Sequence, residues 1–361
     1  MKKIGIDARL LRQTGVGTYL ENLLHYLDRQ KISDISFYVY LMSEDFDKTV
    51  FKNKKIIKRK ADFRWHTIGE QLGFLWALYQ DKLDLMHFTY FSYPFFYMRK
   101  FMATVHDVTL LNFKSGKASS KSELLYQIKY FFFKILFENQ IRKAAKIITP
   151  TRTVKKQLVE IFGREIKKKT LPIYEGVDYR VLKEKENKKL EGKFEDFFIY
   201  VGNFYPHKNV ERLIAAFSKL KKPSSLILMG PDDYFTKRLE PLVASKKNVH
   251  LIKNSPTSDL IFFYKNARAL IHPSFSEGFG LPLVEAAHFG CPIIASNIPV
   301  FKELFGGSYI SFNPYDVSDI ARAIRMSFTK KTKPDYSQIM KKFSFEKMTR
   351  KTRNIYIELT K

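Results

Sequence analysis

The feature that most constrains the fold of this chain is an alternation, present twice, of short apolar runs with stretches of helical periodicity. The first series has candidate strands at residues 2–8, 35–42, 85–88, 101–106 and 146–150. Between them, residues 18–27 and 65–79 carry apolar side chains at helical spacing. In the second stretch one helical face holds Trp65, Ile68, Leu72, Leu75 and Tyr79. A second series starts with FFIYVG at residue 197. Strands that alternate with helices indicate parallel sheets, so the pattern predicts an α/β chain with two doubly wound domains.

A charge-rich segment separates the two series. Residues 171–197 show little apolar periodicity, which is typical of a linker between domains. We therefore predict Rossmann-like domains over residues 1–174 and 175–342. Residues 343–361 read as a closing helix that packs back toward the N-terminal domain. Ligands of doubly wound sheets bind beyond the carboxyl ends of the strands, so polar residues at those ends are candidate site residues.

Composition sets the broad class of protein. With 45% hydrophobic residues, a chain of 361 residues can bury two cores. The single cysteine, Cys291, excludes an internal disulfide framework and fits a reducing compartment. We find no signal peptide at the start and no window of 18 uncharged apolar residues. We expect a cytoplasmic protein.

The net charge of +27 lies mainly in one region. Residues 51–169 hold 25 Lys and Arg against 9 Asp and Glu, and the densest runs are residues 52–60 and 164–169. Such a patch attracts polyanions or an anionic membrane surface, although a solvated lysine-rich face is an equal alternative. Nothing else in the sequence favours nucleic acid, because no zinc-finger spacing or RNP-like motif is present. Peripheral contact with the inner face of the cell membrane is therefore a hypothesis.

The stretch SEGFGLPLVEAAHFG, residues 276–290, carries the strongest chemical signal. A glycine turn leads into a helix whose first position suits Pro282. The N-terminus of such a helix is a natural seat for phosphate. Glu277 in the turn and Glu285 in the helix can both accept hydrogen bonds from hydroxyls. A nucleotide sugar, with phosphates between two hydroxyl-bearing rings, would use all of these features.

Three further positions are weak signals when read alone. Lys208, in GNFYPHKN, follows a strand and could neutralise a diphosphate, but it reads more often as a solvated lysine. His106, beside Asp107, ends a strand of the N-terminal domain, where a lone histidine is usually structural. Gly15 and Gly17 in GVGTYL precede a helix, and a GxG by itself is weak evidence.

Taken together, these motifs resemble those of the retaining glycosyltransferases of family four. The resemblance includes HPSFSEGFGLPLVEAAHFGCPIIAS with its spaced pair of glutamates, and in chain order GVGTYLENLL, HDVTLL, AAKIITPTRTVKKQL, the EGVD element, FFIYVGNFYPHKN and FSFEKMTRKTRNIY. It implies the GT-B fold, in which two Rossmann-like domains face each other across a cleft. The N-terminal domain would then bind the acceptor and the C-terminal domain the nucleotide sugar.

The resemblance also implies roles for individual residues. Glu277 would contact hydroxyls of the donor sugar and Glu285 the ribose. The amides of Gly278, Phe279, Gly280 and Leu281 would lie near the sugar and diphosphate. Lys208 would bind the donor phosphate, His106 a sugar hydroxyl, and the loop with Gly15 and Gly17 would close on the diphosphate. Many relatives have an arginine where this chain has Asn203. Stabilisation of the negative charge on the leaving group would therefore depend more on Lys208, with His207 or Arg212 as alternative assisting residues.

The sequence gives weaker signals for a metal site and for an acceptor site. Asp45-Phe46-Asp47 spells DxD, but no partner motif surrounds it, so we interpret it as a solvated loop and expect no metal. The aromatic segment 88–101 could meet a sugar or lipid-linked acceptor, although packing in the core is slightly favoured. Residues 130–137, YFFFKILF, have apolar side chains on nearly every side of a helix, which indicates a buried helix rather than a membrane-surface one.

The prediction is a metal-independent, retaining hexosyltransferase that needs no cofactor beyond its nucleotide-sugar substrate. Its acceptor would be a hydroxyl of a glycan or of a polyprenyl-linked glycan. GDP-mannose is the first choice of donor, because the relatives that look most similar include mannosyltransferases of surface polysaccharide biosynthesis; UDP-hexoses and dTDP-rhamnose stay open. The alternatives are a nucleotide-sugar epimerase or hydrolase of GT-B architecture, and a non-catalytic basic binding protein.

Overall fold

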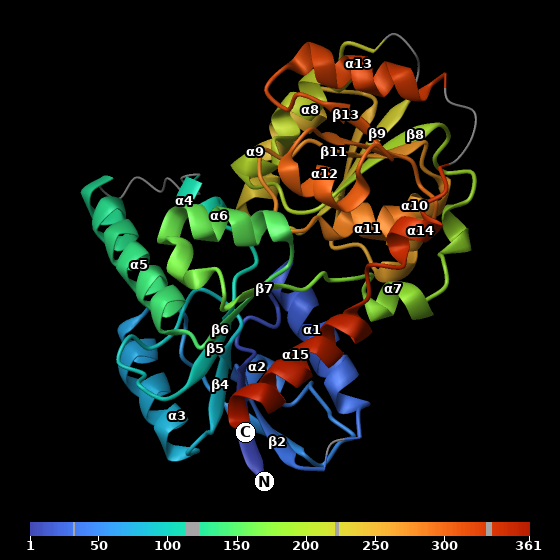
Figure 1. Ribbon diagram of the computed structural model, residues 1–361. Coiled ribbons are helices and arrows are strands. Elements are labelled where there is room, and N and C mark those ends of the chain that lie inside the picture. The colour runs from blue at the N-terminus through green and yellow to red at the C-terminus, as the bar shows by residue number, and fades with distance from the viewer. Residues whose placement is uncertain (32, 113–122, 221–223, 330–333) are drawn as a thin grey trace. The chain divides into compact units, whose positions relative to one another are not determined.

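The computed structural model describes residues 1–31, 33–112, 123–220, 224–329 and 334–361 (Figure 1). It divides into two compact units. Unit 1 comprises Met1–Glu175 together with Phe345–Lys361, and unit 2 comprises Gly176–Ser344. The division after residue 175 lies one residue from the position expected from the sequence, and the last helix belongs to unit 1.

Unit 1 is built on a seven-stranded parallel sheet with strand order β3-β2-β1-β4-β5-β6-β7. Its strands are β1 (Lys2–Asp7), β2 (Ile35–Leu41), β3 (Ile56–Lys60), β4 (Leu85–Phe88), β5 (Phe101–Thr104), β6 (Lys146–Thr149) and β7 (Thr170–Pro172). Its helices are α1 (Val16–Asp28), α2 (Ser43–Phe46), η1 (Glu70–Phe74), α3 (Leu75–Gln80), α4 (Thr109–Asn112), α5 (Glu123–Lys143), α6 (Arg152–Phe162), η2 (Arg164–Ile166) and α15 (Phe345–Thr360).

The strand order of unit 1 decides which helices cover which face of its sheet. From β1 the chain moves outward to β2 and β3, then returns to β4 and continues the other way to β7. Because parallel crossovers are right-handed, the connections on the two sides lie on opposite faces. Accordingly α15 packs on α1 and β4, whereas α3 and α5 cover the other face (Figure 1). Covering both faces explains why β2 is buried over its whole length.

Unit 2 is built on a six-stranded parallel sheet with strand order β10-β9-β8-β11-β12-β13. Its strands are β8 (Phe197–Val201), β9 (Ser225–Gly230), β10 (Val249–Lys253), β11 (Ala269–His272), β12 (Ile293–Ser296) and β13 (Ile310–Phe312). Its helices are α7 (Tyr179–Lys183), η3 (Lys188–Leu190), η4 (Pro206–Lys208), α8 (Val210–Phe217), α9 (Tyr234–Ala244), α10 (Thr257–Asn266), α11 (Leu281–His288), α12 (Pro299–Phe305), α13 (Val317–Ser327) and α14 (Ser337–Met340).

The order of the unit 2 sheet puts β8 and β11 side by side at its centre. Both strands are short and almost completely buried. Because neighbouring parallel strands end at the same edge of a sheet, the loops after β8 and β11 meet there. These two loops carry the candidate residues Lys208 and Glu277.

Two sequence-based interpretations of unit 1 helices are wrong. The stretch 65–79 forms η1, a π-helical turn, followed by α3. Its buried apolar side chains are Phe74 and Leu78, whereas Ile68 and Leu72 are exposed. The segment 130–137 lies in α5, where Phe131 and Phe132 are exposed although Phe137 is buried. In the first helix periodicity identified the helix but not the side that faces the sheet. In α5, apolar residues on nearly every side were wrongly taken to indicate a buried helix. No helix among the described residues combines the length and apolarity needed to span a bilayer.

Candidate active site

The loops after β8 and β11 are tied together by hydrogen bonds. The Phe275 amide donates to the His207 carbonyl oxygen at 2.8 Å. Asn209, in the left-handed region at φ 61°, donates from its side-chain amide to the carbonyl oxygens of Pro273 (3.0 Å) and Pro314 (2.8 Å). These contacts fix Lys208, which lies between His207 and Asn209, against the turn that carries Glu277.

Glu277 is the centre of the site. Its Oε1 accepts hydrogen bonds from Lys208 Nζ at 2.7 Å, His272 Nε2 at 2.8 Å and Ser274 Oγ at 2.7 Å. The side chain of Glu277 is 9% exposed and that of Lys208 is 15% exposed. The structure therefore brings together two of the three residues predicted to be catalytic.

The neighbours of Glu277 keep it ionised. Burial alone would raise its pKa, but the charge of Lys208 and the hydrogen bond from His272 outweigh burial and hold the pKa well below its usual range. Burial lowers the pKa of His272, against the hydrogen bond and charge of Glu277, which raise it. A neutral His272 that donates from Nε2 carries no proton on Nδ1, and Nδ1 has no hydrogen-bond partner among the described residues.

His272 and Ser274 were missed by the sequence analysis. Their signal is the HPS tripeptide at the end of β11, which places a histidine and a serine three to five residues before Glu277. The His272 ring is held between Tyr200, nearly parallel at 5.7 Å between centroids, and Phe301, edge-on at 5.7 Å. This packing fixes the ring that orients the Glu277 carboxylate.

The glycine turn leads directly into α11. Gly280 has φ 93°, and a Cβ on it would lie 2.8 Å from Phe301 Cε1, so only glycine fits this position without strain. The neighbouring Phe279 is buried, with its ring edge-on to Phe343 at 5.6 Å. Leu281 opens α11 with Pro282 after it, and Gly278 is buried in the turn. The predicted turn residues thus form the N-terminal approach to the helix that holds Glu285.

Glu285 lies on α11 in a different environment from Glu277. Its Oε2 accepts a hydrogen bond from the Tyr264 hydroxyl at 3.0 Å, and the side chain is buried. Burial raises the pKa of Glu285 to about 7, although the Tyr264 hydrogen bond opposes the rise. Asp178, which caps α7 and pairs with Arg180 at 2.5 Å, adds to the rise through its negative charge. Tyr264 and Asp178 were also missed as neighbours of this carboxylate.

Asn203 lies on the same loop as Lys208, directly after Gly202 at the end of β8. Its backbone carbonyl accepts a hydrogen bond from the Tyr200 hydroxyl at 2.6 Å. Arg212, on α8, places its guanidinium 5.3 Å from the centre of the Phe275 ring and donates to Asn209 Oδ1 at 3.2 Å. Of the basic residues considered on this loop and helix, Lys208 is the one that contacts Glu277.

The remaining predicted residues lie in unit 1. His106 follows β5, where Nε2 donates to the Thr89 carbonyl at 3.0 Å and Nδ1 lies 3.5 Å from Glu175 Oε1. Its ring also meets Tyr19 edge-on at 4.8 Å between centroids. Asp107 Oδ1 accepts from the Thr109 amide at 2.7 Å, so it supports the turn into α4.

Gly15 and Gly17 begin α1 and have local structural reasons to be glycine. Gly15 has φ 76°, and the space around it is open. A Cβ on Gly17 would lie 2.4 Å from the Leu11 carbonyl oxygen, so glycine permits the close approach of α1 to the preceding segment.

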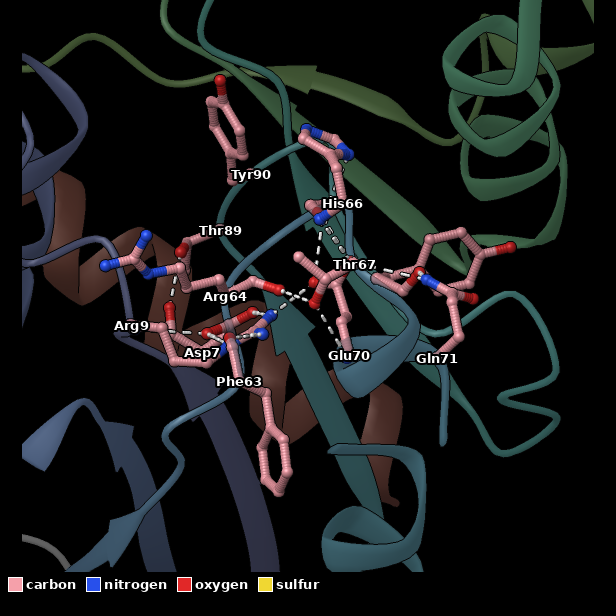
Figure 2. Close-up of polar contacts among 12 residues, drawn as sticks. Asp7, Arg9, Phe63, Arg64, His66, Thr67, Glu70, Gln71, Thr89 and Tyr90 are labelled. Atoms are coloured by element: carbon pink, nitrogen blue, oxygen red, sulfur yellow. Dashed lines mark hydrogen bonds and ion pairs between the residues drawn. The ribbon is translucent and has the colours of Figure 1, made fainter. Parts of the chain in front are cut away.

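A buried ion cluster at the carboxyl end of β1 was not anticipated (Figure 2). The Arg9 guanidinium binds Asp7 at 2.7 Å and Glu70 at 2.8 Å, and it lies 3.8 Å from the centre of the Phe74 ring. Glu70 also accepts from Ser92 Oγ at 2.6 Å and from the His66 amide at 2.9 Å. The cluster joins β1, η1 and the loop that follows β4. Both carboxylates of this cluster pair with the same guanidinium, and Glu70 is held further by a hydroxyl and an amide, so we interpret the cluster as a structural support.

The described residues contain no cluster of His, Cys, Asp or Glu suited to hold a metal ion. The interpretation of residues 45–47 as a solvated loop is wrong for Asp45, which is buried in α2 and paired with Arg12. Its partner Arg12 lies 33 residues away in the sequence, so no local pattern indicated the burial of Asp45.

Comparison with known proteins connects this site to an enzyme class. Residues 182–342, which lie in unit 2, match the family described as glycosyl transferases group 1. The chain is similar to the O-antigen chain mannosyltransferase RfbU of Salmonella typhimurium strain LT2, with 31% identity over 209 residues, 55% of each protein. It is also similar to O-antigen chain mannosyltransferase B of Escherichia coli, with 29% identity over 180 residues, 46% of this chain and 47% of that one. The matches thus span about half the length of these two relatives.

The fold has close counterparts among solved structures. The structure of Anabaena Alr3699/HepE in complex with UDP-glucose superposes with a TM-score of 0.75 at 17% identity and covers 99% of this chain and 100% of that one. The predicted GT-B architecture of two parallel α/β domains is confirmed. The comparisons support a group 1 glycosyl transferase domain in unit 2, the unit that holds Lys208, Glu277 and Glu285.

Proposed function

We propose that this chain is a retaining glycosyltransferase that moves a hexose from a nucleotide-diphosphate sugar to a hydroxyl of a glycan or lipid-linked glycan. One observation carries the proposal. Within the segment that matches the glycosyl transferase family, a partly buried lysine–glutamate pair adjoins a glycine turn and a helix whose acid, Glu285, is buried. This arrangement supports binding of a diphosphate flanked by two hydroxyl-bearing rings.

In the proposed mechanism, Lys208 stabilises charge on the departing diphosphate. Its ammonium has three N–H donors, and the contact with Glu277 uses one of them. The N-terminus of α11 adds its positive dipole end. Fixed groups aimed at developing charge lower the barrier because they need little reorganisation during the reaction.

The two glutamates would bind different parts of the donor. Glu277, held ionised by its neighbours, accepts hydrogen bonds from sugar hydroxyls, and Glu285 accepts from the ribose. His106 bonds a further sugar hydroxyl, a role proposed from its motif. The bond from the anomeric carbon to phosphate breaks as the bond to the acceptor oxygen forms on the same face, and the acceptor proton passes to the leaving phosphate oxygen. No metal enters this proposal.

Mannose is the proposed sugar, with GDP-mannose as the donor. The two similar O-antigen chain mannosyltransferases support it. The similar fold of Alr3699/HepE, which binds UDP-glucose, keeps a UDP-hexose as the competing choice. A nucleotide-sugar epimerase or hydrolase would turn over the donor without acceptor, so product analysis with and without a glycan acceptor separates these activities from transfer.

The acceptor and the membrane are proposed partners. The excess of basic residues between 51 and 169 supports peripheral contact of unit 1 with an anionic membrane surface on the cytoplasmic side. Such contact would bring the enzyme to a polyprenyl-linked acceptor.

A thermal-shift panel of nucleotide sugars, run on the wild type and on Glu285→Ala, tests the proposed function. A ligand that binds the native state raises the melting temperature according to its occupancy. We expect one donor class to stabilise the wild type by several degrees and the variant by much less. A flat panel for every nucleotide sugar, with a normal melting transition, would contradict the proposed function.

A further inference from the structure

Two helices that cover the same face of the unit 1 sheet turn apolar side chains toward solvent. Along η1 and α3, Phe74 and Leu78 are buried against the sheet. The opposite side of this helix presents Ile68, Leu72 and Trp76, which are 79%, 65% and 67% exposed. They recur at every fourth position, so they form one continuous stripe.

The neighbouring helix α5 also turns apolar side chains toward solvent. Phe137 and Ile141 face inward and are buried. Ile128, Phe131, Phe132 and Ile135 are exposed, and their spacing of three, one and three residues places them on one side of the helix. In Figure 1 α3 and α5 lie on the same side of β4, β5 and β6, away from α1 and α15. The two exposed stripes therefore point away from the same face of one sheet.

The loop between β4 and β5 is held to both helices by hydrogen bonds. On one side Gln71 donates to the Tyr93 carbonyl at 3.1 Å and accepts from the Phe95 amide at 2.8 Å. On the other side Gln140 of α5 donates to the Tyr90 carbonyl at 2.8 Å. Figure 2 shows Gln71 beside Glu70, whose ion cluster anchors this turn.

Phe96 and Met98 extend the surface between the helices, because both are exposed on this fixed loop. We name the whole surface the apolar face of unit 1. Most of the exposed large apolar side chains among the described residues lie on it. Soluble proteins rarely expose a contiguous patch of this kind unless it binds something.

Basic side chains are interleaved with the apolar ones. Lys129 and Lys134 are exposed beside Phe131 and Phe132, and Lys134 lies 4.8 Å from the centre of the Tyr130 ring. Lys143 is exposed and lies 5.5 Å from the centre of the Phe95 ring. Long basic side chains beside aromatic ones suit a membrane interface, where the stems cover apolar surface and the charges meet phosphate groups.

We propose that the apolar face of unit 1 inserts into the interfacial region of an anionic lipid bilayer. The charge of this face favours a lipid bilayer over a second copy of the chain as its partner. A symmetric pair through this face would set Lys129 and Lys134 of both copies close together, whereas anionic headgroups would neutralise them. The inference deepens the membrane contact proposed above and rests on it, but it is independent of the identity of the donor.

Flotation with vesicles tests the proposal. Phosphatidylcholine vesicles with and without 30% phosphatidylglycerol are compared for the wild type, Phe131→Ser/Phe132→Ser and the matched control Val50→Ser, which changes an apolar residue 80% exposed elsewhere in unit 1. We expect the wild type and the control to bind the anionic vesicles equally. The double variant should bind at least about tenfold more weakly, because two aromatic side chains no longer enter the lipid.

The tryptophans supply a second, direct readout. The chain has two, so Trp65→Phe leaves Trp76 as the single reporter on the apolar face. We expect its emission to shift to the blue with anionic vesicles and to be quenched by brominated lipid. A thermal shift with nucleotide sugar that is equal in wild type and double variant shows that unit 2 is intact, and so separates failure of this inference from failure of the proposed function.

Three outcomes would overturn the inference. One is the absence of vesicle binding in the wild type. Another is equal loss of binding in the double variant and in Val50→Ser. The third is a dimer in light scattering that dissociates in the double variant, which would assign this face to a second copy of the chain.

Discussion

Glu277 and Glu285 lie on the same turn and helix, yet their surroundings drive their protonation in opposite directions. Glu277 has a lysine, a histidine and a serine on one oxygen, and its pKa lies well below the usual range. Glu285 has one tyrosine hydroxyl and a nearby aspartate, and its pKa is raised to about 7. The difference teaches that burial alone does not decide the charge of a carboxyl group; the partners do. The first acid is a permanent anion, whereas the second titrates near neutrality.

The largest effect on the difference between the two glutamates is expected when the cation that pairs with Glu277 is removed. Lys208→Ala should lower kcat by about 10²–10³-fold, since one group that stabilises developing charge is typically worth that much. Its effect on binding of the bare nucleoside diphosphate should be much smaller. Steady-state kinetics and calorimetry measure the two effects, with the exposed Lys237→Ala as the matched control. Unchanged turnover would remove Lys208 from the mechanism.

The titration of Glu285 should be visible in stability. Between its ordinary pKa of 4.5 and about 7, the folded protein binds more protons than the unfolded chain, so this group lowers stability as pH rises through that window. The full cost, about 3 kcal/mol for a shift of this size, is present above pH 7 and absent below pH 4.5. Glu285→Gln should therefore gain stability relative to the wild type between pH 5 and pH 8 in urea unfolding. The exposed Glu195→Gln should show no such trend.

The glycine turn that separates the two acids can be perturbed without touching either. Gly280→Ala should lower the free energy of unfolding by about 1–3 kcal/mol, because φ 93° is strained for alanine and its Cβ would press on Phe301. Donor affinity should fall with it. Gly307→Ala is the matched control, since no atom lies within 4 Å of its added Cβ. Equal stability of the two variants in chemical denaturation would show that the turn is not strained as described.

The smallest effect should come from the partner of Glu285. Tyr264→Phe removes the hydrogen bond that favours the ionised carboxylate, so the pKa of Glu285 should rise further. The midpoint of the pH dependence of nucleotide binding should move upward by about one unit, the scale of a single hydrogen bond to a charged group. Calorimetric titrations from pH 6 to pH 8 measure this midpoint. A downward shift would contradict the description of Glu285.

Much of the fold could be predicted from the sequence. Alternating apolar runs located five of the seven strands of the unit 1 sheet but missed β3 and β7, whereas the glycine turn and Pro282 located the start of α11. Sequence analysis placed Lys208 and Glu277 after strands but did not predict that they touch. Their contact depends on the adjacency of β8 and β11, which the sequence pattern alone does not state.

The rest depended on contacts between distant segments. His272 and Tyr264 are ordinary strand and helix residues until packing places them on the two carboxylates. Arg9 and Glu70 are 61 residues apart, so no local pattern reveals their ion pair. The apolar residues of 130–137 were assigned to a buried helix because they lie on nearly every side of it, and that interpretation assumes that apolar side chains face inward. That assumption fails where a surface is made to meet a partner.

Calorimetric binding of two ligands to two variants tests the central claim most directly. A nucleotide-diphosphate hexose and the matching bare nucleoside diphosphate would be titrated into Glu277→Gln, Glu285→Ala and the wild type. We predict that Glu277→Gln loses at least about tenfold in affinity for the nucleotide sugar but binds the nucleoside diphosphate as tightly as before. Glu285→Ala should weaken both ligands alike. Equal weakening of both ligands by Glu277→Gln, or no weakening by either variant, would contradict the division of the donor between the two acids.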